Sequence, residues 1–547
     1  MGPDSPHRIQ LMSSVKNILF HALPAWGHNK PMAALAVIIL RARPEIVITV
    51  ITTGIIYPKF NNELKSKLSA EEYDMLSSRI NIIDVSGPEI NIFEPLKEFG
   101  LAYTAIWNSE PVICKSSGRT FSGLPPPTVA VIDVCISPPR VRSFYPMTFT
   151  ISQPFAAYAY EHIHATPQMK VPIITWLSAP SGPLLRLFGP ASLGGDAHPS
   201  IETEAGLKQA RLRLSEPLSE ETKPLPQPVA SAVLEKTKVP GMPPMYAHEW
   251  KPQTSLLPEG PFEKFGQIYM RVGDGIIIVS NSVYENESMK ATKEWFSGIG
   301  KPSYALAPLS LPKPKSRQDD EKEISLFLNT MKERFGPKSL IYISFGTFFW
   351  PPQLEKLIVL IETLIANQTP FIFSHSSPLA TNLSSEFLTL IRDSGIAMEM
   401  AWSPQETILQ HEVTGWFITH GGWNSIQESF EHKVPLIFWP MGADQPVNAA
   451  VLSLTHKAAF ELIEVRSGEN GTKPLLRFEN TDYKPTFTVD AVKAEVEGLL
   501  AKIKGDEGRI VRSNFESLGE EMWRSWEEGR QSRTELNEFL EKFVDSV

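Results

Sequence analysis

Two cysteines, Cys114 and Cys135, are all that the chain has among its 547 residues. So few thiols exclude a disulfide-stapled scaffold and a cysteine zinc cluster, and they are typical of a reducing compartment. No uninterrupted apolar run reaches the roughly 18 residues that a membrane-spanning helix needs. The N-terminal stretch MGPDSPHRIQLMSSVKN also lacks the apolar centre of a signal peptide. These absences predict a cytoplasmic protein without a membrane span.

Long basic segments and clusters of metal ligands are missing as well. The formal net charge is −9, so we expect no nucleic-acid partner. His162 and His164 are too isolated from other ligand residues to predict a metal site, and we expect neither a metal nor another cofactor. Neither half of the chain shows G-x-G-x-x-G after its first predicted strand, which disfavours a nicotinamide-dependent dehydrogenase.

Short β-branched runs alternate with helical stretches in the first half of the chain. A helix is predicted at 31–43, with Pro31 in its first turn and Pro44 ending it. A proline-rich segment, 190–261, interrupts the pattern, and we expect it to be a surface insertion. Buried strands are predicted at 15–23, 45–53, 80–85, 128–134 and 275–282.

The second half repeats this alternation, with strands predicted at 339–347, 370–376, 395–402, 415–420 and 434–440. Two such repeats predict an α/β protein with two doubly wound, Rossmann-like domains that face each other across a cleft. The expected organisation is a flexible tail at 1–14, a first domain at 15–308, a linker at 309–323, a second domain at 324–520 and a C-terminal segment at 521–547.

The C-terminal segment contains an amphipathic helix. Its apolar residues share one helical face and are Leu536, Phe539, Leu540, Phe543 and Val547. Ser532 and Glu535 have the spacing of a capping box at the start of this helix. The apolar face could pack on its own domain, or the helix could cross back onto the first domain. We expect the second arrangement.

The stretch THGGWNSIQE follows a predicted strand and opens a predicted helix. Gly421 and Gly422 allow the backbone to approach a ligand, and the helix N-terminus offers free N–H groups to a phosphate. Asn424 and Ser425 add side-chain donors, and the Glu428 carboxylate could accept hydroxyls of a ribose. Tight packing is the commoner reason for such a turn, so this turn alone leaves both interpretations open.

The flanking residues make the pattern specific. Residues 402–445 contain WSPQ, L-Q-H, GWFITH, GWNS, a glutamate, VP and ADQ in that order. This stretch resembles the signature box of the family 1 UDP-sugar-dependent glycosyltransferases in its plant secondary-metabolite form. Many members of that family carry cysteine where Gly421 stands in this chain. The resemblance implies a GT-B fold and makes the UDP-sugar a co-substrate rather than a cofactor.

Carried over residue by residue, the resemblance gives each part of the UDP-sugar its contacts. Trp402 would stack on uracil, and the backbone of Ser403 would read the edge of the base. Gln405 and Glu428 would hold the ribose. The diphosphate would contact Gly346, Thr347, His420, Gly422, Asn424 and Ser425, and the sugar would contact Trp423, Asp444 and Gln445. For single residues other roles remain open, because Trp423 could belong to the core, Asp444 could form a turn and the SFGT loop could be a plain turn.

The stretch LPAWGHNKP ends the first predicted strand and resembles the G-H-x-x-P loop of the same family. His28 would then be the general base, and Asp133, at the end of the strand 128–134, would be its partner. A neutral imidazole can take the proton of a hydroxyl acceptor near neutral pH. Asp133 would orient the ring and stabilise the imidazolium that forms.

The sequence therefore predicts an inverting, metal-independent transferase, expected to be a monomer. The alternatives are a nucleotide-sugar epimerase or hydrolase of the same architecture and a catalytically silent UDP-sugar-binding protein. Aromatic residues suggest an apolar acceptor such as a terpenoid, phenol or sterol, and the candidate contacts are Phe93, Trp107, Phe155 and Tyr158. By resemblance, Gln445 favours UDP-glucose as the donor, with UDP-xylose as the alternative.

Overall fold

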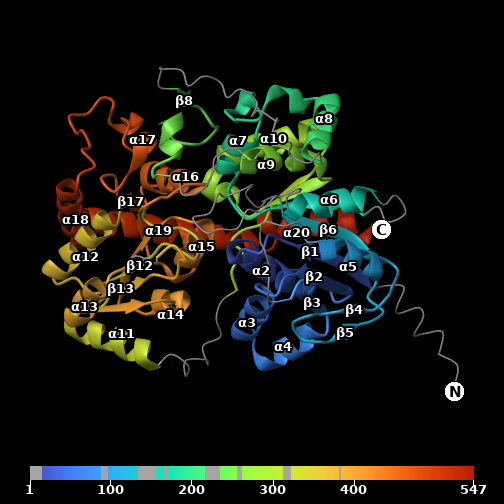
Figure 1. Cartoon of the computed structure of the whole chain (residues 1–547), viewed down its shortest axis with the longest axis horizontal. Coiled ribbons are helices and arrows are strands. Elements are labelled where there is room, and N and C mark those ends of the chain that lie inside the picture. The colour runs from blue at the N-terminus through green and yellow to red at the C-terminus, as the bar shows by residue number, and fades with distance from the viewer. Residues whose placement is uncertain are drawn as a thin grey trace.

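The fold consists of two parallel sheets with helices packed around them, placed side by side (Figure 1). The computed structural model describes residues 15–87, 97–133, 155–165, 171–215, 235–254, 261–311, 322–380 and 383–546. In Figure 1 the blue and green half holds the first sheet, and the yellow and orange half holds the second. This is the predicted arrangement of two Rossmann-like domains.

Within the described residues the first sheet has seven parallel strands in the order β11-β10-β7-β6-β1-β2-β3. Their bounds are β1 (Lys16–His21), β2 (Ile46–Thr52), β3 (Ile80–Asp84), β6 (Pro127–Asp133), β7 (Ile173–Leu177), β10 (Gly275–Ile278) and β11 (Ser303–Ala305). The strands are apolar runs buried on both faces, as parallel strands covered by helices are. All the strands predicted in this half are confirmed, and β7 and β11 were not predicted.

The helices of this half are α2 (Trp26–Ala42), α3 (Tyr57–Lys67), α4 (Ala70–Ser77), α5 (Lys97–Trp107), α6 (Phe155–Ala165), α7 (Ser181–Phe188), α8 (Glu204–Ser215), α9 (Pro261–Val272) and α10 (Ser282–Gly298). Two antiparallel pairs, β4 (Val112–Ile113) with β5 (Thr120–Phe121) and β8 (Lys236–Thr237) with β9 (Met245–Tyr246), complete it. The predicted start of the first helix at Pro31 is wrong, because α2 begins at Trp26 and contains Pro31. Proline lacks only one donor, and a helix tolerates that loss where another group uses the freed carbonyl.

The second sheet has six parallel strands among the described residues, in the order β14-β13-β12-β15-β16-β17. Their bounds are β12 (Leu340–Ser344), β13 (Phe371–Ser374), β14 (Ala397–Met400), β15 (Thr414–Thr419), β16 (Leu436–Phe438) and β17 (Ala459–Glu461). The helices are α11 (Lys322–Phe335), α12 (Leu354–Ala366), α13 (Ser385–Asp393), α14 (Gln405–Gln410), α15 (Trp423–His432), α16 (Gln445–Ala450), α17 (Gly468–Gly471), α18 (Val489–Lys504), α19 (Asp506–Trp523) and α20 (Gln531–Leu540). The short strand β17 was not predicted.

A single hydrophobic cluster runs through both halves. It includes Leu35 and Val279 from the first half, Ile426 from the second and Phe539 from the C-terminal helix. Each sheet also packs on a separate apolar cluster of its own half. The shared cluster fixes how the two halves meet, and therefore where loops from the two sheets come together.

The C-terminal helix α20 packs on β11 of the first sheet, and Figure 1 shows the red end of the chain among the blue and cyan elements. The ring centroids of Tyr304 and Phe539 are 5.6 Å apart. The predicted capping box is wrong, because Arg530 is the N-cap and no side chain caps the helix. Ser532 Oγ instead donates to the carbonyl oxygen of Ala307 (2.9 Å), and Glu535 Oε2 accepts from the N–H of Ala305 (2.6 Å). These polar groups bind the first half of the chain rather than their own helix.

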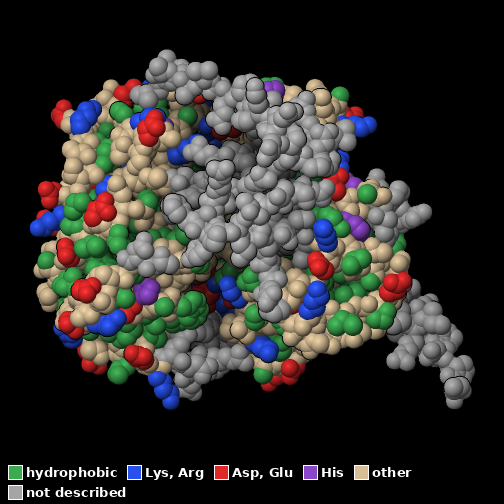
Figure 2. Space-filling model, in the orientation of Figure 1, with side chains coloured by type: hydrophobic (Ala, Val, Ile, Leu, Met, Phe, Trp, Pro, Cys, Tyr) green, Lys and Arg blue, Asp and Glu red, His purple; other side chains and the backbone are tan. Residues whose placement is uncertain are grey.

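The surface carries charges of both signs. Figure 2 shows basic and acidic side chains interspersed over one face, with no broad field of one sign among the side chains coloured there. In the part of the chain that the structure describes, no helix is both long and apolar enough to span a membrane.

Candidate active site

Two topological switch points position the predicted site loops. The order of the first sheet reverses between β1 and β6, where His28 follows β1 and Asp133 ends β6. The order of the second sheet reverses between β12 and β15, which Gly346 and His420 follow. Ligands of doubly wound sheets bind beyond the carboxyl ends of the strands at such points. Loops far apart in the sequence therefore meet where a ligand is expected.

His28 and Asp133 are in direct contact. His28 Nδ1 lies 2.8 Å from Asp133 Oδ2, and the exposed fraction of the side chain is 22% for His28 and 1% for Asp133. The N–H of Leu23 also donates to Asp133 Oδ2 (3.2 Å), and Ser178 Oγ lies 3.1 Å from His28 Nδ1. Because an ionised carboxylate only accepts hydrogen bonds, Nδ1 carries the proton and Nε2 is the nitrogen able to take one.

Pro31 explains a contact between the two domains. Proline has no N–H, so the carbonyl of Gly27, four residues earlier in α2, receives no helical hydrogen bond from it. That carbonyl accepts from Asn424 Nδ2 at 2.6 Å instead. Helix α2, which carries His28, is thereby joined to α15, the helix that begins within the stretch THGGWNSIQE.

The turn after β15 has the backbone geometry of an anion site. Helix α15 begins at Trp423 with Gly422 as its N-cap, and its first N–H groups have no partner within the helix. Gly421 has a φ of 89°, and a Cβ there would lie 2.7 Å from the Phe438 ring. This chain therefore has no room for the cysteine that many family members carry at that position. Ser425 is buried in the first turn of α15.

His420 lies between this turn and the turn after β12. A Cβ at Gly346, which has a φ of 73°, would lie 2.9 Å from the His420 ring, and one at Gly422 would lie 2.6 Å from it. Only glycine leaves space for the imidazole at both positions. Burial lowers the pKa of His420 to about 4, so the ring is neutral at neutral pH and can donate one hydrogen bond. Thr347, next to Gly346, is exposed.

The predicted contacts to uracil and ribose lie together after β14 and on α15. Trp402 is 68% exposed, as a ring that awaits a stacking partner would be. Ser403 is buried, and its hydroxyl lies 2.7 Å from the Tyr342 hydroxyl, which also donates to Gln405 Oε1 (3.3 Å). Gln405 Nε2 donates to Glu428 Oε2 (2.6 Å), so the two predicted ribose contacts hold each other in place.

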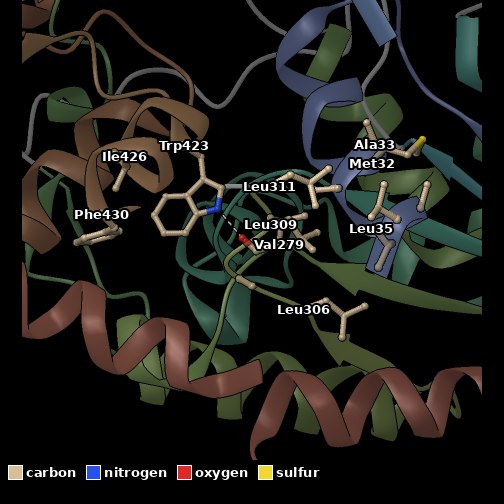
Figure 3. Close-up of a cluster of buried hydrophobic side chains, with 14 of the residues drawn as sticks. Met32, Ala33, Leu35, Val279, Leu306, Leu309, Leu311, Trp423, Ile426 and Phe430 are labelled. Atoms are coloured by element: carbon tan, nitrogen blue, oxygen red, sulfur yellow. Dashed lines mark hydrogen bonds between the residues drawn. The ribbon is translucent and has the colours of Figure 1, made fainter. Parts of the chain in front are cut away.

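Trp423 does not present its indole to the predicted sugar site. The side chain lies in the shared hydrophobic cluster, where its Nε1–H donates to the carbonyl of Val279 at 2.5 Å (Figure 3). The residue is 3% exposed, and its ring centroid lies 4.6 Å from that of Tyr284. The indole's one donor is already used in this cluster, and the backbone N–H of Trp423 is hydrogen-bonded to Asp444. Contact of Trp423 with the sugar stays a prediction.

Asp444 and Gln445 follow β16. Burial raises the pKa of Asp444 to about 6, although a hydrogen bond from Asn448 and the nearby His28 lower it in part. Asn448 Nδ2 donates to Asp444 Oδ2 (2.8 Å) and to the carbonyl of Gly421 (3.0 Å). Gln445 Oε1 accepts from the N–H of Met441 (2.9 Å), so the Nε2 end of its amide is the part left to contact a sugar. The charge interaction between Asp444 and His28 places the predicted sugar contact beside the predicted base.

The candidate acceptor contacts fall into two groups. Phe93 and the side chain of Phe155 lie outside the described residues. Trp107 packs on the apolar cluster of the first half, and the Tyr158 ring lies 5.9 Å from that of His162. Contact of these residues with an acceptor stays a prediction.

The structure adds residues that the sequence did not single out. Ser178 contacts His28, Tyr342 contacts Ser403, Asn448 contacts Asp444, and Lys30 contacts Glu428. Ser178 follows β7 and Tyr342 lies in the middle of β12, and neither belongs to a motif in the sequence. Lys30 lies inside the G-H-x-x-P loop, but at a position that the motif leaves open. Among the residues that the structure describes, no three His, Cys, Asp or Glu side chains are grouped to hold a metal ion.

Known proteins match this chain in sequence. Residues 314–470 match the family model for UDP-glucoronosyl and UDP-glucosyl transferase. The UDP-glycosyltransferase eriJ of Hericium erinaceus is 26% identical over 97% of this chain and 100% of its own length. The anthocyanidin 3-O-glucosyltransferase UFGT of Vitis vinifera is 42% identical over 23% of this chain and 26% of its own length. The matched region of the family model contains the whole predicted signature box.

Solved structures also match this chain in fold. The crystal structure of Medicago truncatula UGT71G1 complexed with UDP-glucose aligns with a TM-score of 0.61 at 18% identity, over 97% of this chain and 98% of that one. This likeness confirms the predicted GT-B architecture of two facing Rossmann-like domains. The family model, which matches mainly the second domain, and a relative that matches along its whole length both support assignment of the chain to the family 1 UDP-glycosyltransferases.

Proposed function

We propose that the protein is an inverting glycosyltransferase that moves a sugar from a UDP-sugar to a hydroxyl of a small apolar acceptor. One observation carries the proposal. His28, whose Nδ1 lies 2.8 Å from Asp133 Oδ2, is on helix α2, which is hydrogen-bonded through Gly27 to Asn424 of the turn after β15. A base from one domain and a phosphate site from the other are thus held at one interface.

The path of the acceptor's proton follows from the geometry of the His28–Asp133 pair. His28 Nε2 takes the proton of the acceptor hydroxyl while Nδ1–H stays bonded to Asp133. The acceptor oxygen forms a bond to the anomeric carbon as the bond from that carbon to the UDP oxygen breaks. Attack from the face opposite the UDP inverts the anomeric configuration. The buried carboxylate of Asp133 stabilises the imidazolium until its proton leaves.

The leaving diphosphate needs positive charge or donors close to its oxygens. In this proposal the first N–H groups of α15 and the side chains of Asn424 and Ser425 supply the donors. His420 enters this site neutral, since burial lowers its pKa to about 4, and it acts as a hydrogen-bond donor. We propose that these groups stabilise the leaving group without a metal ion.

The donor and acceptor classes are the finer part of the proposal. We propose UDP-glucose as the donor, with UDP-xylose as the alternative, and Asp444 and Gln445 as the sugar contacts. The name of the Vitis vinifera relative, an anthocyanidin 3-O-glucosyltransferase, supports a phenolic acceptor. Terpenoid and sterol alcohols are the other apolar acceptors to be tried.

The test compares His28→Ala with wild type on two acceptors. With a phenol and UDP-glucose we expect the transfer rate to fall by roughly 10²–10⁴, which is the usual contribution of a general base. An acidic thiol acceptor should lose little, because a thiol with a pKa of about 8.5 ionises partly without help. Asp133→Asn should cost less than His28→Ala, since it removes only orientation and charge support. Product formation is followed by mass, and UDP affinity by calorimetry.

His162→Ala is the matched control, since this ring lies on α6 beside α5 and not at the first switch point. Equal losses for phenol and thiol, or no loss for either, would show that His28 is not the proton acceptor. Sugar release from UDP-glucose without any acceptor would favour a hydrolase, and binding without turnover would favour a silent binding protein.

A further inference from the structure

Charged side chains from both domains form a buried group beside the predicted ribose contacts. This interdomain ion cluster consists of Lys30 on α2, Glu63 and Lys67 on α3, Glu406 on α14 and Glu428 on α15. None of these side chains is more than 15% exposed. Buried charges are costly unless they are paired, so a cluster at this place calls for a reason.

Lys30 is at the centre of the interdomain ion cluster. Its Nζ lies 2.7 Å from Glu428 Oε1, 2.9 Å from Glu406 Oε1 and 4.0 Å from Glu63 Oε1. Lys67 Nζ lies 2.5 Å from Glu406 Oε2, whereas the ion pair with Glu428 is made by Lys30. A first-domain ammonium is therefore bonded directly to the carboxylate that is expected to hold the ribose.

The Glu428 carboxylate still has room for a ligand. Oε1 accepts from Lys30, and Oε2 accepts from Gln405 Nε2 at 2.6 Å. An ionised carboxylate offers about four lone-pair positions, so these two bonds fix its orientation and leave about two for hydroxyl donors. Both fixed bonds are charge-assisted and short, as strong hydrogen bonds to carboxylates are.

We propose that Lys30 is a positioning residue of the donor site, which orients the Glu428 carboxylate toward the ribose hydroxyls of the UDP-sugar. This inference rests on the proposed function, because it takes a ribose as the ligand of Glu428. It also makes the nucleotide site a product of both domains, although the signature box lies wholly in the second.

The charges around Glu428 show why it needs a cation. The titratable groups that face it are Lys30, Glu63, Lys67, Glu406, His432 and Tyr342. Burial lowers the pKa of His432, so this ring supplies no charge at neutral pH. Burial raises the pKa of Tyr342 to about 12, so its hydroxyl is neutral there as well. Without Lys30, the carboxylates of Glu63, Glu406 and Glu428 would share the single ammonium of Lys67. Glu428 would then lose the hydrogen bond that fixes Oε1, and only the bond from Gln405 would orient it.

Calorimetric titration of Lys30→Met with UDP tests the proposal. We expect UDP affinity to fall about tenfold, which matches the loss of one hydrogen bond to a charged group. With 2′,3′-dideoxy-UDP, which lacks the hydroxyls, Lys30→Met and wild type should bind alike. Lys30→Arg should restore most of the affinity for UDP.

Lys67→Met is the matched control, because it removes the same charge from the interdomain ion cluster but not from Glu428. Should Lys30→Met fail to fold, the double variant Lys30→Met with Glu406→Gln removes one charge of each sign and isolates the same contact. Both variants are first compared with wild type by thermal unfolding.

The outcomes distinguish a failure of the proposed function from a failure of the role of Lys30. A wild type that does not bind UDP contradicts the proposed function itself. Wild-type binding with an unchanged Lys30→Met, or an equal loss for UDP and for 2′,3′-dideoxy-UDP, overturns the role of Lys30 alone. An equal loss in Lys67→Met would assign the effect to summed charge, and tighter binding by Lys30→Met would show that Lys30 competes with the ribose. Either result also overturns the proposal.

Discussion

Replacing Trp402 with alanine should weaken UDP binding and leave the fold intact. The residue is 68% exposed, so the variant loses little buried surface and creates no cavity in the core. Stacking of a base on an aromatic ring contributes about 1–3 kcal/mol. That range corresponds to a roughly 5- to 150-fold weaker affinity for UDP. Calorimetric titration with UDP measures the affinity, and thermal unfolding checks the fold.

Trp402→Phe separates stacking from other effects of the substitution. A benzyl ring still offers a face to uracil, so this variant should keep more of the affinity than Trp402→Ala does. Unchanged UDP affinity in a folded Trp402→Ala protein would remove the residue from the nucleotide site. A large drop in thermal stability would show instead that the indole supports the fold, against its exposure in the structure.

Two further predictions concern Asp444 and the C-terminal helix. Burial raises the folded pKa of Asp444 from 3.8 to about 6, so the unfolded state releases this proton first as pH rises, and stability is lost between those two values. Asp444→Asn removes this loss of stability. The melting temperature of the variant minus that of wild type should therefore be higher at about pH 7 than at about pH 4. Sugar transfer should fall in this variant, and its affinity for UDP should stay the same. An unchanged difference would contradict the raised pKa. Ser532→Ala should lower the free energy of unfolding in urea by about 1–3 kcal/mol, because the buried N–H of Ala307 loses its acceptor, Ser532 Oγ at 3.2 Å. Ser546→Ala, which removes an exposed hydroxyl of the same C-terminal segment, should change nothing, and equal effects would refute a specific contact.

Local patterns carried most of the fold and of the nucleotide site. The signature box is contiguous in the sequence, and its strand, turn and helix follow one another in β15 and α15, so spacing alone could reveal it. The pairing of His28 with Asp133 needed one more step. Each residue follows or ends a strand, and the switch point of the first sheet brings the two strand ends together.

The sequence could not show contacts that depend on how the domains pack. The direction of the Trp423 indole is set by Val279 and Tyr284, which lie far away in the chain. The strands β11 and β17 have three residues each, which is too few to show a period, whereas β7 was missed although it is a buried apolar run as long as β3. The capping-box spacing of Ser532 and Glu535 was a coincidence of residue types, since both side chains bind the first half of the chain. Such contacts follow from tertiary structure, which overrides local preference.

The route of the chain between the two domains restricts how they can move. The backbone passes from β11 to α11 on the way out, and it returns between α19 and α20, which ends against β11. Because α20 returns to the first sheet, any motion that moves the two domains apart near this helix must also separate its apolar face from β11. The domain interface should therefore be harder to open beside α20 than at the sheet edges farthest from it.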